Sequence, residues 1–149
     1  MRACVQRVGR AHVSVDNEIV GRIGRGLVVL VGVAAGDDER DVKWLAERVV
    51  NLRIFPDDEG KMNRSLKDTG GELLAISQFT LLGDARKGLR PSFVTAADPE
   101  TGNRLYREFV ESVRGMNIAV AEGRFRADMQ VELVNDGPVT LLLDSRKAF

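Results

Sequence analysis

Residues that most often carry metal-dependent or nucleophilic chemistry are nearly absent from this sequence. Cys4 is the only cysteine and His12 the only histidine in 149 residues. One cysteine cannot form an internal disulfide, and no histidine pair, cysteine pair or clustered ligand set has the spacing of a metal site. We therefore expect no metal ion and no cofactor. A Ser-His-Asp or Cys-His arrangement would have to use His12, which is more simply an ordinary residue of a predicted strand.

Net charge and long apolar runs are lacking as well. Lys plus Arg and Asp plus Glu both number 22. Neutrality argues against a general nucleic-acid-binding protein, but not against one that holds a nucleic-acid end through a local patch. No apolar run approaches the length of a membrane span, and residues 1–5 lack the apolar core of a signal peptide. These absences favour a cytoplasmic protein without membrane contact.

Three local patterns suggest a ligand at first sight. The glycine-rich stretch Gly21–Gly26 lacks the order of a P-loop and precedes a strand, so hairpin and bulge glycines explain it better. The acidic residues 57–59 fit a short turn, because no calcium-binding spacing follows them. The basic residues Arg86, Lys87 and Arg90 form the best local patch. They predict either a phosphate-binding loop or an ordinary solvated loop, and the sequence leaves both open.

The length and a hydrophobic content of 44% fit one compact domain over residues 1–149. Period-two alternation predicts the outer strands, and the continuous apolar run 26–33 predicts a strand buried on both faces. Asp16-Asn17 has the composition of a hairpin turn. The expected strands cover residues 2–8, 11–15, 26–33, 73–82, about 117–121, 128–135 and 138–144.

Two amphipathic helices are expected between these strands. The first begins at Asp37 or Asp38 as N-cap, and the second at Asp98, with Pro99 in its first turn and Gly115 at its end. Their apolar faces comprise Val42, Leu45, Ala46, Val49 and Leu52 in the first, and Leu105, Tyr106, Phe109, Val110 and Val113 in the second. The order of elements predicts an α/β fold with barrel-like β-sheet layers covered on one side by two helices.

Two polar motifs interrupt the apolar strands. Ser77-Gln78-Phe79-Thr80 lies within the predicted strand 73–82, where Gln78 and Thr80 would share one face and Ser77 and Phe79 the other. Asn135-Asp136-Gly137-Pro138-Val139-Thr140 separates the last two predicted strands. Taken alone, the first motif is compatible with polar strand residues that are hydrogen-bonded to neighbouring backbone, and the second with a plain hairpin turn. Together they predict a site that is built largely from backbone, because buried polar groups need partners or a ligand.

These motifs resemble the D-aminoacyl-tRNA deacylase family, also called D-Tyr-tRNA deacylase. The resemblance rests on Ser77-Gln78-Phe79-Thr80-Leu81, Arg90-Pro91-Ser92-Phe93, Ala127-Asp128-Met129-Gln130-Val131 and Asn135-Asp136-Gly137-Pro138-Val139-Thr140. Val5-Gln6-Arg7-Val8 and Arg53-Ile54-Phe55…Gly60-Lys61-Met62-Asn63 are also similar, so the likeness runs from end to end. The combination of the Ser-Gln-x-Thr and Asn-x-Gly-Pro-Val-Thr motifs at this spacing is specific.

The resemblance implies a homodimeric hydrolase with two sites at the subunit interface. It implies cleavage of the ester between a D-amino acid, or mischarged glycine, and the terminal adenosine of tRNA, as proofreading in translation. Ser77, Gln78, Phe79 and Thr80 would form the catalytic site, with Phe125 and Met129 around the adenosine and ester. Gly137-Pro138 would be a cis-proline motif that enters the partner's site and rejects L-amino acids, steadied by Arg7. Arg86, Lys87 and Arg90 would bind tRNA.

The mechanism remains open between two alternatives. Backbone N–H groups near Gln78 and Phe79 are candidates for an oxyanion hole, since an activated ester needs mainly positioning and charge stabilisation. Thr80 is a possible nucleophile, but no base to activate it can be named. We favour assistance by the ribose 2′-hydroxyl of the substrate. Two rival functions also stay open: an RNA-end-binding module without turnover, which would use the basic loop and Phe93, and an esterase for small D-amino acid esters or peptides.

Overall fold

The computed structural model describes all residues from Met1 to Phe149. The strands are β1 (Arg2–Val15), β2 (Glu18–Ile23), β3 (Gly26–Gly32), β4 (Phe55–Pro56), β5 (Met62–Arg64), β6 (Glu72–Ser77), β7 (Val120–Glu122) and β8 (Gln130–Asp144). The helices are α1 (Glu39–Asn51), α2 (Leu66–Thr69), the 3₁₀ helix η1 (Phe79–Leu82) and α3 (Pro99–Arg114). None of the helices is both long and apolar enough to cross a lipid bilayer.

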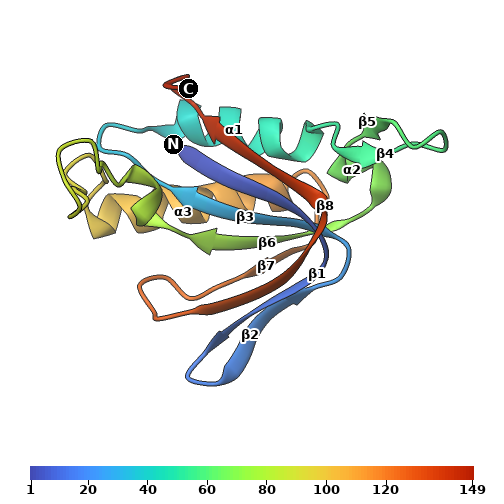
Figure 1. The fold of residues 1–149 in the computed structure, drawn as a ribbon, viewed down its shortest axis with the longest axis horizontal. Helices are drawn as coiled ribbons and strands as arrows, with labels where there is room; N and C mark the ends of the chain where they lie inside the picture. The colour runs from blue at the N-terminus through green and yellow to red at the C-terminus, as the bar shows by residue number, and fades with distance from the viewer.

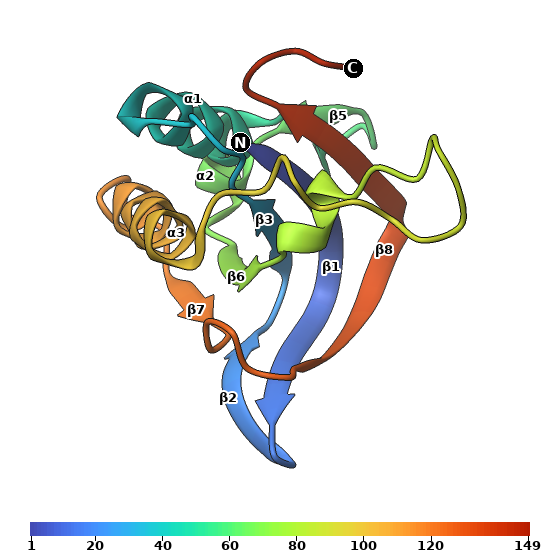
Figure 2. The ribbon, with the colours of Figure 1, turned by 90° about the vertical axis from the view of Figure 1, so that its left-hand side faces the viewer.

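The sheet is organised around β1. One edge of β1 pairs with β8 from Arg2–Asp144 to Ser14–Gln130. The other edge pairs first with β3 and then with β2, so the sheet has the order β2-β1-β3-β6-β7 with β8 beside β1 (Figure 1). The far ends of the sheet approach each other, since a Cβ added to Gly21 of β2 would lie 2.5 Å from the Glu122 carbonyl oxygen of β7. The sheet is therefore strongly curved and nearly closed into a barrel (Figure 2).

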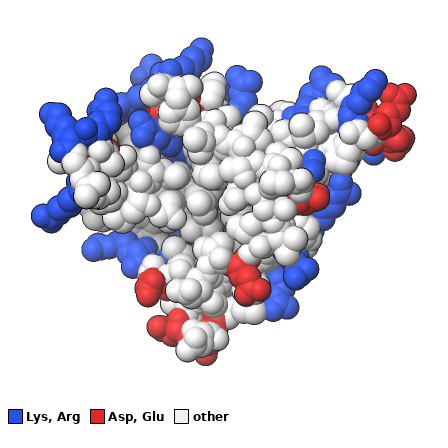
Figure 3. All heavy atoms as spheres, in the orientation of Figure 1, with Lys and Arg blue, Asp and Glu red and all other residues white.

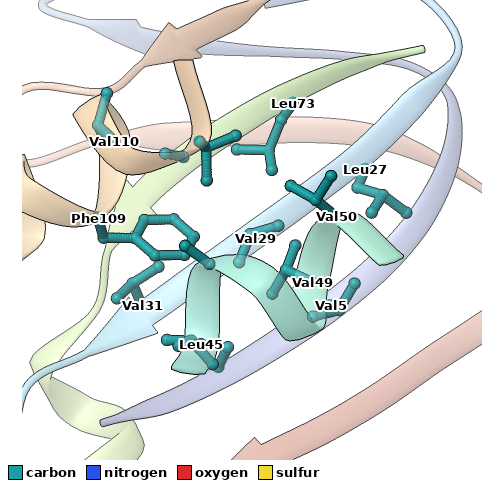
Figure 4. Packing of buried hydrophobic residues seen from close by; sticks show 14 of the residues in the cluster. Val5, Leu27, Val29, Val31, Leu45, Val49, Val50, Leu73, Phe109 and Val110 are labelled. Carbon is teal, nitrogen blue, oxygen red and sulfur yellow. The ribbon is translucent and has the colours of Figure 1, made fainter. Parts of the chain in front are cut away.

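Both faces of the central strands are buried, as the apolar run 26–33 predicted. Leu27, Val29 and Val31 of β3 belong to a large cluster beneath the helices, together with Leu45 of α1 and Phe109 of α3 (Figure 4). Val28 points to the opposite face, into a smaller cluster inside the curved sheet. Figure 2 places α1 and α3 together on one side of the sheet, which confirms the predicted arrangement of two long helices over one face.

The predicted helix boundaries are confirmed by capping geometry. Asp38 is the N-cap of α1 and forms a capping box with Asp41. Asp98 caps α3 and accepts a hydrogen bond from the Thr101 N–H, with Pro99 in the first turn. Burial of their predicted apolar faces supplies most of the stability of α1 and α3, because isolated helices of this length are only marginally stable in water.

Several strand predictions were wrong in extent. Residues 2–8 and 11–15 form one strand, β1, and the hairpin turn at Asp16-Asn17 leads into β2, which was not predicted. Residues 128–135 and 138–144 also form one strand, β8. The predicted strand 73–82 ends at Ser77 and continues as the 3₁₀ helix η1, so the proposed alternation of faces fails beyond that residue. The β4–β5 hairpin and the short α2 were not predicted.

The close approach of β3 and β6 requires a glycine at position 26. Substitution of Gly26 therefore tests the packing of the sheet. A Cβ on Gly26 would lie 1.8 Å from the Glu72 carbonyl oxygen, whereas one on Gly24 would meet nothing within 4 Å. We expect Gly26→Ala to lower the free energy of unfolding by at least about 3 kcal/mol. Gly24→Ala, the matched control, should leave it unchanged or raise it by up to about 1 kcal/mol. Urea denaturation measures both, and equal effects would contradict the assigned β3–β6 contact.

Candidate active site

The Ser77–Thr80 motif lies where β6 leaves the sheet. Parallel pairing with β3 ends at Val31–Ser77, and the Gln78 N–H makes a last sheet bond of 2.7 Å to the Val31 carbonyl oxygen. The chain then turns into η1, whose end is closed by a 2.9 Å bond from the Gly83 N–H to the Thr80 carbonyl oxygen. Phe79 and Thr80 are exposed as a result. The turn presents these residues at one end of the curved sheet.

A cavity of about 550 Å³ opens beside this turn. Ser77, Gln78 and Phe79 line one wall, and Phe125 and Met129 line another. The structure thus brings together five of the six residues that the resemblance assigns to this site, and the sixth, Thr80, does not line the cavity. Met129 also packs against the apolar cluster inside the curved sheet. Gly123 leaves room for it, because a Cβ there would lie 2.5 Å from the Met129 sulfur.

A third wall of the cavity was not anticipated from the sequence. It comes from the start of α3, where Asp98, Pro99 and Gly102 line the space, and from Arg126 in the loop before β8. Asp98-Pro99 was recognised only as a helix start, and no sequence feature marks Arg126. α3 is held against β6 by Tyr106, whose hydroxyl donates a 3.0 Å hydrogen bond to the Ala75 carbonyl oxygen. Burial raises the pKa of Tyr106, so this donor stays protonated.

Hydrogen bonds within the motif decide which of its groups are free. The Gln78 side-chain amide donates to the Thr80 hydroxyl oxygen, so these two side chains are linked. The Gln78 backbone N–H is used by the Val31 carbonyl and cannot serve in an oxyanion hole, which corrects the expectation from sequence. The N–H groups of Phe79 and Thr80 begin η1, and the first N–H groups of a helix have no partner within it.

The Gly137-Pro138 motif forms a bulge within β8. Gln6 pairs with Thr140 and Val8 with Asn135, so a single β1 residue, Arg7, faces four residues of β8. The bulge is closed by a 3.0 Å bond from the Val139 N–H to the Asn135 side-chain oxygen. The peptide bond between Gly137 and Pro138 is cis, as expected. Both residues are exposed, and neither lines the cavity of its own chain.

Arg7 joins this bulge to the body of the protein. Its side chain is almost fully buried, with the residue only 9% exposed. The guanidinium donates a 3.1 Å hydrogen bond to the Asp136 carbonyl oxygen and a 2.6 Å bond to the Ile54 carbonyl oxygen. The Asp136 carboxylate lies 3.4 Å from the same group. A buried, multiply bonded guanidinium fixes a loop firmly, because leaving its partners unsatisfied is costly.

The basic patch lies on a projecting loop after η1. Backbone bonds of 2.8 and 2.9 Å between Asp84 and Ser92 close this loop, and its residues are exposed. Figure 3 shows Lys and Arg side chains gathered at the left of the view, where Figure 1 draws this loop. Arg86 is paired with Asp84 at 2.6 Å and holds the pKa of that carboxyl well below its usual range. Lys87 and Arg90 form no ion pair within the chain.

Groups of other catalytic classes lie apart from the cavity. His12 is 3.5 Å from the Glu132 carboxylate on the β1–β8 surface and does not line the cavity. No group of three or more His, Cys, Asp or Glu side chains is arranged to hold a metal ion. Cys4 is partly buried, and this burial raises the pKa of its thiol, which disfavours the reactive thiolate.

Comparisons with known proteins agree with the motifs. Residues 4–144 match the family model described as D-Tyr-tRNA(Tyr) deacylase. A D-aminoacyl-tRNA deacylase of Desulfitobacterium hafniense is 58% identical over the full length of both chains. One of Syntrophotalea carbinolica is 59% identical, again over the full length of both chains.

Two solved structures share the fold of this chain. A c-Myc DNA unwinding element binding protein is 39% identical, with a TM-score of 0.91 over 97% of this chain and 98% of its own. A probable eukaryotic D-amino acid tRNA deacylase shares the fold at 21% identity, with a TM-score of 0.81 over 95% of this chain and 97% of its own. The family model and the full-length relatives identify a hydrolase that acts on the ester of D-aminoacyl-tRNA, and the chain belongs to the D-aminoacyl-tRNA deacylase (D-Tyr-tRNA deacylase) family.

Proposed function

We propose that the chain proofreads translation in the cytoplasm as a homodimer, by removing D-amino acids and mischarged glycine from tRNA at two sites between its subunits. The observation that carries this proposal is the cavity in which Ser77, Gln78 and Phe79 meet Phe125 and Met129. These residues come from motifs far apart in the sequence, and the resemblance assigns all of them to one substrate site. The cavity size suits a small aminoacyl group with part of a nucleoside.

The proposed chemistry needs little from protein side chains. An aminoacyl ester is activated, so holding water in place and stabilising the developing oxyanion account for the acceleration. The Phe79 and Thr80 N–H groups at the start of η1 are the donors that we propose for the oxyanion. The Thr80 hydroxyl accepts a hydrogen bond from the Gln78 amide, which is not a base, so this partner cannot activate Thr80 as a nucleophile. Assistance by the 2′-hydroxyl of the terminal ribose is the alternative that we favour.

Chiral selection is proposed to come from the Gly137-Pro138 motif of the partner subunit. The motif is exposed on its own chain, and the buried Arg7 holds it through a hydrogen bond to the Asp136 carbonyl oxygen. A rigid and exposed segment of this kind is suited to enter the site of a second subunit. Backbone atoms placed close to the substrate α-carbon would collide with an L side chain and leave a D side chain free. Glycine has no side chain to collide, which accounts for its proposed acceptance.

The surface of β8 supports the proposed dimer. β8 pairs only with β1, so its outer edge has unpaired backbone groups that can be covered by a second chain. Leu142 is 60% exposed on this strand and Val134 is 42% exposed. The middle of the face that carries β1 and β8 shows few charged side chains in Figure 3. An uncharged surface with exposed aliphatic groups is typical of the centre of a homodimer interface.

The proposed function is tested by deacylation of D-tyrosyl-tRNA and L-tyrosyl-tRNA by the purified protein. We expect release of D-tyrosine at a rate at least about 100-fold above that of L-tyrosine, since steric exclusion in a rigid site is worth several kcal/mol. Glycyl-tRNA should be hydrolysed as well. From the lack of a ligand cluster in the sequence, we expect the same rates with EDTA.

The rival functions predict different results in this assay. Binding of tRNA without release of the amino acid would support a nucleic-acid-binding module. Nucleic-acid binding is the function stated in the name of the c-Myc DNA unwinding element binding protein. Equal hydrolysis of free D-tyrosine ethyl ester and D-tyrosyl-tRNA would support a small-ester esterase. Loss of activity with EDTA and its recovery with zinc would contradict the metal-free mechanism.

The role of Thr80 is tested by substitution. We expect Thr80→Ala and Thr80→Ser to keep substantial activity on D-tyrosyl-tRNA, because the hydroxyl has no base beside it. Removal of a true nucleophile typically lowers kcat by about 10⁴-fold or more. Single-turnover kinetics measure the loss, and mass spectrometry of quenched reactions searches for an aminoacyl group on Thr80. A trapped covalent adduct would establish Thr80 as the nucleophile.

The basic loop is proposed to contact phosphates of the tRNA acceptor end. Replacing Arg86, Lys87 and Arg90 together with Ala should raise KM and flatten the dependence of log kcat/KM on log salt. Each lost contact reduces the slope by about 0.7 to 0.9 units. Asp84 already pairs with Arg86, so Arg86 is less available to a phosphate. The single variants Lys87→Ala and Arg90→Ala should therefore each change KM and the salt slope more than Arg86→Ala does. An unchanged slope in the triple variant would make this loop a solvated surface.

A further inference from the structure

Arg126 is an unusual residue of the cavity wall. Its backbone lies in the left-handed region with a φ of 64°, which residues other than Gly, Asn and Asp rarely adopt. It lines the cavity between Phe125 and Met129, and it is exposed to solvent. A strained residue that persists in a cavity wall points to a functional contact, which other observations must identify.

Arg126 differs in charge from the other residues that line the cavity. Among the residues that line the cavity it is the only cation, beside the carboxylates of Asp98 and Asp128. Asp98 is engaged as the N-cap of α3, where it accepts a bond from the Thr101 N–H. The Arg126 guanidinium forms no hydrogen bond or ion pair within the chain, whereas Arg104 of α3 is paired with the carboxylates of Glu39 and Glu108. Arg126 is therefore available to an anion that enters with the ligand.

The substrate brings one such anion to this position. An aminoacylated tRNA end consists of the amino acid ester, the terminal adenosine and the phosphodiester that links this adenosine to the preceding nucleotide. If the ester and the adenosine fill the cavity, that phosphodiester remains at its rim. The carboxylate of Asp128 repels it, whereas a guanidinium binds phosphate oxygens with paired hydrogen bonds.

We propose that Arg126 binds the phosphate between the terminal adenosine and the preceding nucleotide of the tRNA, and thereby distinguishes a nucleic-acid end from a free aminoacyl-nucleoside. The proposal rests on the proposed deacylase function. It assigns a substrate contact to a residue outside the quoted motifs.

Comparison of two substrates tests the phosphate contact. D-Tyrosyl-tRNA carries the phosphate, and D-tyrosyl-adenosine, its terminal fragment, lacks it. We expect Arg126→Ala to raise KM for D-tyrosyl-tRNA about fivefold, the scale of one exposed charge pair. The salt slope of log kcat/KM should fall by about 0.7 units, and kcat should not change. With D-tyrosyl-adenosine the variant should match the wild type.

Three further variants separate charge from backbone strain. Arg126→Gly accepts the positive φ without cost, so it should lose affinity as Arg126→Ala does while keeping or raising the melting temperature. Arg126→Lys keeps the charge and should recover part of the affinity. Arg124→Ala is the matched control, since Arg124 is exposed two residues earlier but does not line the cavity. It should change neither KM nor the salt slope by a comparable amount.

The outcomes distinguish this proposal from the proposed function. An unchanged KM of Arg126→Ala for D-tyrosyl-tRNA, or an equal loss on both substrates, would overturn the phosphate contact and leave the deacylase assignment standing. A loss in Arg126→Ala that Arg126→Gly restores would also overturn it, because the effect would then come from the backbone. No hydrolysis of either substrate by the wild type would overturn the proposed function and the phosphate contact together.

Discussion

The arrangement of the whole molecule depends on the antiparallel pairing of β8 along nearly all of β1. This pairing leaves the other edge of β1 to β3 and β2 in succession, and the curved sheet that results from these pairings brings β2 close to β7. The β1–β8 pairing also contains the larger of the two register breaks between these strands, opposite Arg7. There four residues of β8 stand out from the ladder, and the guanidinium holds the first of them, Asp136. The exposed Gly137-Pro138 motif is a consequence of that break.

The candidate site collects the ends of several elements. β6 ends at Ser77, α3 begins at Pro99, and the loop before β8 supplies Phe125 to Met129. Backbone groups at such ends have free hydrogen-bonding capacity, which a site with few reactive side chains requires. In the proposed dimer the Arg7-anchored bulge of one subunit completes the cavity of the other. In this proposal the substrate's 2′-hydroxyl assists the attack of water, main-chain N–H groups stabilise the oxyanion, and a rigid segment of the partner positions the substrate. Other hydrolases rely on a catalytic triad instead.

The parts of the structure that local patterns determine could be predicted from the sequence. Asp98-Pro99 identified the start of α3, and the apolar run 26–33 identified a strand buried on both faces. The 3₁₀ helix η1 was missed because Phe79–Leu82 is as apolar as a strand, and only the end of the β3–β6 pairing makes it turn. β8 was divided in two because a Gly-Pro pair resembles a turn. Arg126 was missed because it lies outside the motifs and an arginine carries no sequence signal of a positive φ.

Each proposed site needs a cavity from one subunit and the Arg7-anchored bulge from the other. This requirement is tested by mixing two variants: Gly102→Trp, which fills the cavity, and Arg7→Ala, which removes the guanidinium that holds the bulge. Each variant alone should be inactive on D-tyrosyl-tRNA. Subunit exchange at equal concentrations makes about half of the dimers hybrid with one intact site each, so activity should return to about a quarter of the wild-type value. Hybrid dimers, isolated through different tags, that remain inactive would contradict a shared site.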